Sequence, residues 1–234
     1  MIITNPQRSD GFGAQFQTII YSYIFSKLTN NEFIYTPFEK MEHNYEDNTD
    51  FIEKKEELIN FKNSFKHNYN DQIIFTYPVQ FFINFFEKHI NDPRTINELK
   101  LITKIFKNNK QKPFTNKTIV IHIRRKNKHD NRIEGTDIPI QNYITLINEK
   151  KQEYNIIIHS QGSIEEFKDI PNDIKINIKL NTSVEESFTD MVFADILVSA
   201  KSSFSYTAAL LNEGIIYYIP FWHKPMNNWI TINL

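Results

Sequence analysis

The stretch that decides the fold is Ile119–Asp130, IVIHIRRKNKHD, in which a β-branched segment ends in two adjacent arginines. Residues 118–123 predict a buried strand, and Arg124 and Arg125 follow it directly. Adjacent strand residues point to opposite faces, so one arginine can face a ligand while the other braces the scaffold. A guanidinium fork suits a phosphate better than a lysine does. The alternative is a solvated strand end whose arginines form surface salt bridges.

Strands and helices alternate on the C-terminal side of this stretch. The strands are predicted at 118–123, 154–159, 174–178, 196–199 and 215–219, and the helices at 139–152, 184–193 and 202–212. Such alternation requires crossover connections and therefore predicts a parallel sheet. Ligands of an open parallel sheet bind at the carboxyl ends of its strands, which is where the two arginines stand.

The N-terminal side begins with the same rhythm. A strand at 1–4, a turn-rich loop at 5–13, a helix from Gln15 and a strand at 33–36 follow one another. The region from 45 to 112 is mostly helical by pattern, with helices predicted after Pro78 and over 95–107, and 108–114 has the composition of a linker. We therefore expect two α/β lobes with a boundary near residue 112.

Composition narrows the classes of function. The 234 residues have a formal net charge of -1, which argues against a general nucleic-acid or membrane-surface binder. The chain has no cysteine, which excludes disulfides and thiolate metal sites and favours a reducing, cytoplasmic compartment. No apolar run approaches the roughly 18 residues of a membrane span. Nucleic-acid binding by the basic stretch at 124–128 is therefore the weakest of the alternative functions.

Two further loops are candidate ligand sites. In RSDGFGAQFQ, residues 8–17, Gly11 and Gly13 permit tight backbone geometry before a helix N-terminus, which attracts anions. In VSAKSSFSYTAALL, residues 198–211, Ser202 and Ser203 stand where a strand gives way to a helix. The alternatives are an ordinary strand–helix turn in the first case and a simple helix cap in the second. No metal motif is present, and His43 and His223 are isolated residues that we interpret as structural or surface positions.

Three motifs, taken in order, resemble the GDP-fucose-dependent fucosyltransferases, namely the α-1,2 and α-1,6 enzymes and the protein O-fucosyltransferases. GFGAQFQTIIYSYIFS resembles the first motif of the α-1,6 enzymes, IHIRRKNK resembles their H-x-R-R-x-D-K, and ADILVSAKSSFSYTAALL resembles the last motif. The similarity covers residues 1–30 and most of 115–220.

The resemblance implies an α/β fold of the GT-B-like type, with two Rossmann-like lobes and mostly parallel sheets. It implies a metal-independent, inverting transfer of fucose from GDP-fucose to a glycan hydroxyl, with no cofactor. Residues 1–112 would form the acceptor side, and residues 113–234 would bind the GDP-sugar.

The resemblance also assigns roles to residues. The implied catalytic residues are Arg124 on the β-phosphate, Glu134 as the base and Lys128 as the motif lysine. The implied donor-binding residues are His122 against the guanine, Arg125, Asn127, Tyr143, Ser160, Ser202 and Ser203 in the C-terminal lobe, and Gly11, Gly13 and Gln15 in the first motif.

The sequence departs from the family at three places where an acidic residue or pair is expected. Asn127 stands where the motif has an aspartate, and Ser160-Gln161-Gly162 replaces an acidic pair. Ser187 stands where a carboxylate is expected before the last strand, with Glu186 and Asp190 nearby. These differences leave two alternatives open. The same fold can use another nucleotide-sugar donor, or the protein can be a non-catalytic relative that binds a nucleotide or a glycan.

Overall fold

The computed structural model describes residues 1–44, 48–67, 73–125 and 137–234. The chain divides into two compact units, Met1–Gln111 and Lys112–Leu234. Each unit contains its own parallel sheet, so the expectation of an α/β fold with parallel sheets is confirmed.

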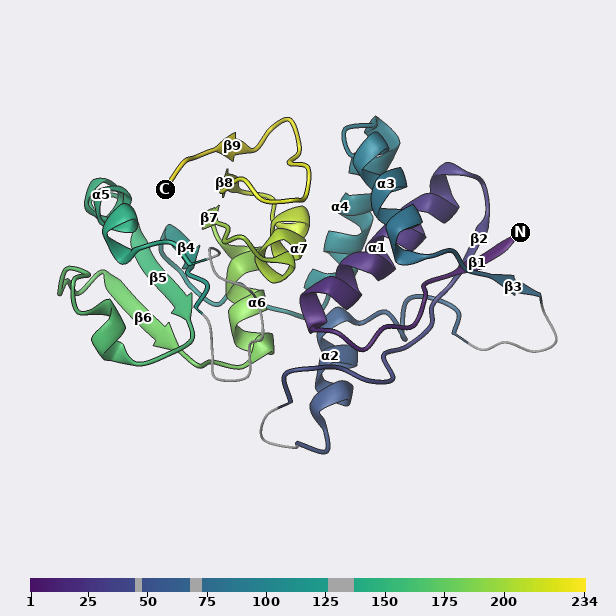
Figure 1. The fold of residues 1–234 in the computed structure, drawn as a ribbon, viewed down its shortest axis with the longest axis horizontal. Helices are drawn as coiled ribbons and strands as arrows, with labels where there is room; N and C mark the ends of the chain where they lie inside the picture. The colour runs from purple at the N-terminus through teal and green to yellow at the C-terminus, as the bar shows by residue number, and fades with distance from the viewer. Residues whose placement is uncertain (45–47, 68–72, 126–136) are drawn as a thin grey trace. The chain divides into compact units, whose positions relative to one another are not determined.

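The described part of the Met1–Gln111 unit contains a three-stranded parallel sheet in the order β2-β1-β3 and four helices. Its elements are β1 (Ile2–Thr4), α1 (Phe12–Leu28), β2 (Glu32–Ile34), α2 (Phe51–Ile59), β3 (Ile74–Phe75), α3 (Val79–His89) and α4 (Pro93–Lys107). Figure 1 shows α1 beside α3 and α4, and α1 also contacts β1 and β2. A helix covered on most sides must be apolar around most of its circumference, as α1 is.

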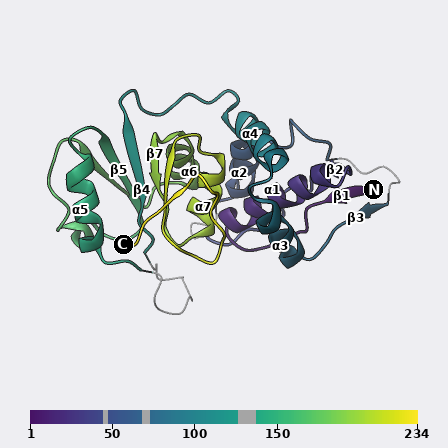
Figure 2. The ribbon, with the colours of Figure 1, turned by 90° about the horizontal axis from the view of Figure 1, so that it is seen from above.

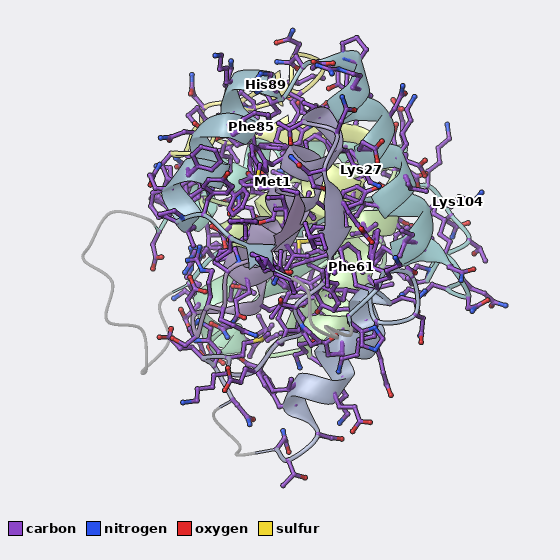
Figure 3. All side chains as sticks on the ribbon, turned by 90° about the vertical axis from the view of Figure 1, so that its right-hand side faces the viewer. Met1, Lys27, Phe61, Phe85, His89 and Lys104 are labelled. Atoms are coloured by element: carbon purple, nitrogen blue, oxygen red, sulfur yellow. The ribbon has the colours of Figure 1, made fainter. Side chains whose placement is uncertain are left out.

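Aromatic side chains fill the core of this unit. Tyr21 of α1 stacks on Phe86 of α3 with 3.9 Å between the ring centroids. Phe25 lies one turn further along α1 and meets Phe85 of α3 edge to face. The ring of His89 lies next along α3, with 4.3 Å between its centroid and that of Phe85 (Figure 3). Because aromatic rings bury large areas and prefer offset or edge-to-face contacts, this packing fixes α3 against α1.

The Lys112–Leu234 unit contains a six-stranded sheet in the order β6-β5-β4-β7-β8-β9, in which every pairing is parallel. Its elements are β4 (Thr118–His122), α5 (Ile140–Lys150), β5 (Asn155–Ser160), η1 (Ile164–Phe167), β6 (Ile176–Leu180), α6 (Val184–Phe193), β7 (Ile196–Val198), α7 (Ser203–Leu211), β8 (Ile215–Tyr218) and β9 (Ile230–Thr231). Counted from β4, the strands run 3-2-1-4-5-6, which is the order of doubly wound, Rossmann-like sheets.

The two faces of β4 pack against different helices. Ile119, Ile121 and Ile123 join the apolar cluster that contains Tyr143 and Ile147 of α5. The intervening residues of β4 face α6 and α7 instead, as the ring contact between His122 and Phe204 shows. Figure 2 shows α5 on one side of β4, β5 and β7, and α6 and α7 on the other.

Most of the predicted elements are present, with shifted ends. The helix predicted at 184–193 is α6 with the same limits, whereas the strand predicted at 174–178 is displaced to β6. The two-residue strands β3 and β9 were not predicted, so the strand at 215–219 is not the last one. Strands this short leave no periodic pattern in the sequence.

Gly214 precedes β8 at a point of close backbone approach. A Cβ atom added at Gly214 would lie 2.4 Å from the carbonyl oxygen of Asp195, which accepts the N–H of Ile215 at 3.0 Å. Gly214→Ala should therefore force β8 away from β7 and lower the free energy of unfolding by about 1–3 kcal/mol. Denaturant unfolding of the variant and the parent measures this difference. An unchanged free energy would contradict the close approach.

Candidate functional site

The carboxyl edge of the six-stranded sheet holds the candidate site. β4 and β7 are neighbours at the point where the strand order reverses. The helix that follows β4 is α5, and the helix that follows β7 is α7, on the opposite face of the sheet (Figure 2). Because the two connections part at this point, open parallel sheets bind their ligands here.

Arg124 and Ser202 meet at this reversal. The NH1 group of Arg124 donates a hydrogen bond to the Ser202 hydroxyl oxygen at 2.6 Å. Ser202 is 2% exposed and is the N-cap of α7, where its hydroxyl oxygen also accepts the backbone N–H of Phe204. Guanidinium has five N–H donors and a permanent charge. Among the described residues, the side chain that the Arg124 guanidinium contacts is the neutral hydroxyl of Ser202.

Ser205 of α7 stabilises the turn between β7 and α7. The buried Ser205 hydroxyl oxygen accepts the backbone N–H of Ala200 at 3.0 Å, and the N–H of Ser202 donates to the Ala200 carbonyl. The first N–H groups of a helix lack partners within it, and the helix dipole adds partial positive charge there. Arg124 and the start of α7 therefore make one electropositive corner that suits an oxygen anion.

Arg125 points to the other face of the sheet. Its NH1 group donates to the carbonyl oxygens of Arg124 and Ile138, both at 3.0 Å, and its guanidinium carbon lies 5.8 Å from the centroid of Phe167. These contacts tie the end of β4 to the segment that precedes α5. The structure thus places the two arginines on opposite sides of the strand, and Arg125 braces the backbone.

Three other residues implied by the motifs lie in different surroundings in the same unit. The ring of His122 lies on the α7 side, 5.7 Å from the ring of Phe204. The hydroxyl of Ser160 donates to the carbonyl oxygen of Ile123 at 2.7 Å and so supports the end of β4. Tyr143 is 1% exposed inside the apolar cluster under α5, where burial raises the pKa of its hydroxyl to about 12.

A cluster of polar and charged side chains, which no sequence motif marks, joins β5, β6 and α6. His159 Nε2 lies 2.8 Å from Asp190 Oδ2, which Lys179 Nζ also approaches to 2.8 Å, and His159 Nδ1 meets the Thr182 hydroxyl at 3.1 Å. Burial raises the pKa of Asp190, but hydrogen bonds from His159 and Lys179 outweigh it, so the pKa lies below its usual value. Lys179 also pairs with Glu186.

His223 is placed beside the start of α7, although the sequence gave no reason to link it to Ser203. The Ser203 hydroxyl lies 3.2 Å from His223 Nε2, and Trp222 Nε1 donates to the same nitrogen at 3.1 Å. His223 is 5% exposed and its ring packs on Tyr206. Burial lowers the pKa of His223 to about 4, so the imidazole is neutral at pH 7.

The glycine-rich loop belongs to the Met1–Gln111 unit and has a structural explanation there. Gln15 is 4% exposed, and its amide donates to the carbonyl oxygens of Asp10 and Lys40 at 2.6 and 2.8 Å. A Cβ atom at Gly11 would lie 2.9 Å from the ring of His43, and Gly13 is in the first turn of α1. The adjoining shallow depression is lined by Gln7, Arg8, Ser9, Glu39 and Lys40.

The other residues singled out in the sequence are Asn127, Lys128 and Glu134, and all three lie outside the described residues. In the described part of the chain no helix is both long and apolar enough to cross a membrane. No group of three or more His, Cys, Asp or Glu side chains among those residues is arranged to hold a metal ion.

No protein-family model matches the chain, and no curated protein matches its sequence. Among solved structures, the chain is similar to the E. coli heptosyltransferase WaaC with ADP, at 11% identity and a TM-score of 0.49, over 96% of this chain and 88% of that one. WaaC with ADP-2-deoxy-2-fluoro heptose matches at 12% identity and a TM-score of 0.47, over 98% of this chain and 91% of that one. The dodecameric iron-containing heptosyltransferase TibC in complex with ADP-D-beta-D-heptose matches at 10% identity and a TM-score of 0.42, over 92% of this chain and 57% of that one.

These similarities are too weak to carry an argument about function. They lend no support to fucose in particular, because the proteins named are heptosyltransferases.

The buried imidazole of His223 predicts a specific loss of stability in acid. Its pKa is about 4 in the folded protein and 6.5 ordinarily, so between these values the unfolded chain binds a proton that the folded protein does not. The contribution of the neutral His223 imidazole to the free energy of unfolding is fully present above pH 6.5. It is lost as the pH falls toward 4, by up to about 3 kcal/mol.

His223→Gln should lack this component, because the amide oxygen can accept from Ser203 and Trp222 without titrating. Free energies of unfolding of parent and variant, measured from pH 7 to pH 4, should therefore draw together as the pH falls. A constant difference across this range would show that His223 does not titrate with a lowered pKa.

Proposed function

We propose that this protein is a glycosyltransferase that uses a nucleotide-sugar donor and binds the donor diphosphate between Arg124 and the start of α7. The observation that carries the proposal is the hydrogen bond from Arg124 to the capping hydroxyl of Ser202 at the reversal of strand order. A guanidinium, a hydroxyl and the N–H groups of a helix start together present donors and positive charge to phosphate oxygens.

The reaction makes use of this charge. An acceptor hydroxyl oxygen attacks the anomeric carbon, the bond from that carbon to the diphosphate oxygen breaks, and the diphosphate leaves with the electron pair. Negative charge therefore develops on the leaving group, where a fixed arginine stabilises it most in the transition state. The hydroxyl proton passes to a carboxylate base. Glu134, with Lys128 nearby in sequence, is the residue that the motif resemblance proposes for this role.

The identity of the donor is the finer part of the proposal. The three ordered motifs favour GDP-fucose, with transfer to a glycan hydroxyl and residues 1–112 on the acceptor side. Asn127 and Ser160 replace acidic residues of that family, and Ser160 uses its hydroxyl to support Ile123. Another nucleotide sugar is therefore the alternative donor. Binding without turnover would identify the protein as a non-catalytic relative.

Calorimetric titration with GDP, ADP, UDP and dTDP distinguishes these possibilities, followed by assays for release of the nucleoside diphosphate with the matching sugars and a glycan panel. We expect one nucleotide to bind well ahead of the others and its sugar to be transferred. Failure of all four nucleotides to bind would overturn the proposal.

The adjacent arginines provide a matched pair of variants. Arg124→Ala removes a charged donor from the diphosphate, so nucleotide binding should weaken about 10- to 100-fold with little change in stability. Arg125→Ala removes the same charge but loses the bonds to the Arg124 and Ile138 carbonyls, so it should lower the free energy of unfolding by about 1–3 kcal/mol. Calorimetry and denaturant unfolding of both variants measure the contrast. Equal nucleotide affinity in Arg124→Ala and the parent would contradict the role of Arg124.

A further inference from the structure

We infer that Trp222 is the platform on which the base of the bound nucleotide stacks. This inference rests on the proposed function, because it takes the diphosphate to lie at Arg124 and the start of α7. It assigns a binding role to a segment, 219–229, that none of the three sequence motifs includes.

Trp222 combines exposure with fixed orientation. The residue is 68% exposed, and it is the largest of the exposed apolar side chains described in its unit. Its indole nitrogen nevertheless donates to His223 at 3.1 Å, and its ring lies against Phe221 with 3.7 Å between the centroids. An isolated exposed apolar residue needs no explanation, but an indole held by a buried partner has already lost part of its rotational freedom. Such an indole can bind a flat ligand at a smaller entropic cost.

The buried partner connects the indole to the start of α7. His223 Nε2 accepts a hydrogen bond from Trp222 and lies 3.2 Å from the Ser203 hydroxyl, so these two side chains adjoin the same atom. His223 is in turn held by the ring of Tyr206, at 4.7 Å between centroids, and Tyr206 donates to the carbonyl oxygen of Lys224 at 2.6 Å. The segment that carries Trp222 is therefore fastened to α7 itself.

This arrangement fits the spacing of a nucleotide. A nucleoside diphosphate has one ribose between its phosphates and its base, so a diphosphate at the start of α7 brings its base within reach of a side chain adjoining Ser203. Indole is the most polarisable aromatic surface available in proteins, and every base offers a flat π face to it. Stacking of this kind supplies affinity but tolerates any base, so it does not select between guanine and adenine.

The test separates the base from the phosphates. GDP, ADP, UDP and inorganic pyrophosphate are titrated calorimetrically into the parent, Trp222→Ala, Trp222→Phe and Arg124→Ala, with Ile174→Ala as the control at a fully exposed apolar residue of the same unit. Trp222→Ala should weaken binding of whichever nucleotides bind the parent by about 5- to 150-fold and leave pyrophosphate unchanged. Trp222→Phe should recover most of the nucleotide affinity, whereas Arg124→Ala should weaken nucleotides and pyrophosphate alike.

The outcomes distinguish this inference from the proposed function. If Trp222→Ala binds nucleotides like the parent while Arg124→Ala does not, the stacking role is wrong and the diphosphate site stands. If Trp222→Ala also loses pyrophosphate, the indole acts by holding the start of α7, and the inference is again overturned. Failure of the parent to bind any nucleotide would remove the proposed function itself. Thermal unfolding of each variant checks the fold, and Trp222→Phe keeps the test decisive should Trp222→Ala be destabilised.

Discussion

The alternation of side chains along β4 is the constraint on which the Lys112–Leu234 unit depends. Ile119, Ile121 and Ile123 are buried under α5 and hold the register of the strand. That register places Arg124 on the α7 face and Arg125 on the α5 face, because a shift of one residue would exchange them. The burial of the isoleucines and the placement of the guanidinium are therefore one physical constraint.

The charges of this unit fall into two kinds. Asp190 is buried, but His159 and Lys179 both contact its carboxylate, so its negative charge is compensated within the fold. Such a cluster ties β5, β6 and α6 together, because His159 of β5 and Lys179 of β6 share the buried carboxylate of Asp190 in α6. Arg124 instead donates to the neutral hydroxyl of Ser202. The charge of Asp190 therefore has partners within the described fold, and the charge of Arg124 is the one that the proposed diphosphate would meet.

Local sequence patterns predicted the parts of the fold that depend on local periodicity. The alternation of strands and helices, the limits of α6 and the opposite directions of Arg124 and Arg125 all follow from neighbours within a few residues. The short strands β3 and β9 could not be predicted, because two residues define no period. Their pairing is decided by the strands beside them.

Contacts between distant residues account for the rest of what the sequence could not predict. His159 and Asp190 are 31 positions apart, and Ser203 and His223 are 20 apart, so only the completed sheet brings each pair together. Tyr143 differs from these residues, because the local sequence does indicate its environment. It lies one helical turn before Ile147, and that spacing predicts a core position rather than a ligand contact.

In the proposed nucleotide site, the recognition of phosphate and the recognition of the base are separable. Arg124, Ser202 and the N–H groups of α7 would bind phosphate oxygens, which all nucleotide sugars share. A stacking indole adds affinity for any base. Selecting one base requires hydrogen bonds to its edge, and the motif resemblance proposes His122, whose ring lies on the α7 face, for the contact with the base. Affinity for a nucleotide can therefore survive sequence changes that alter which nucleotide is preferred. The replacement of family acidic residues by Asn127 and Ser160 is compatible with a working diphosphate site and a different donor.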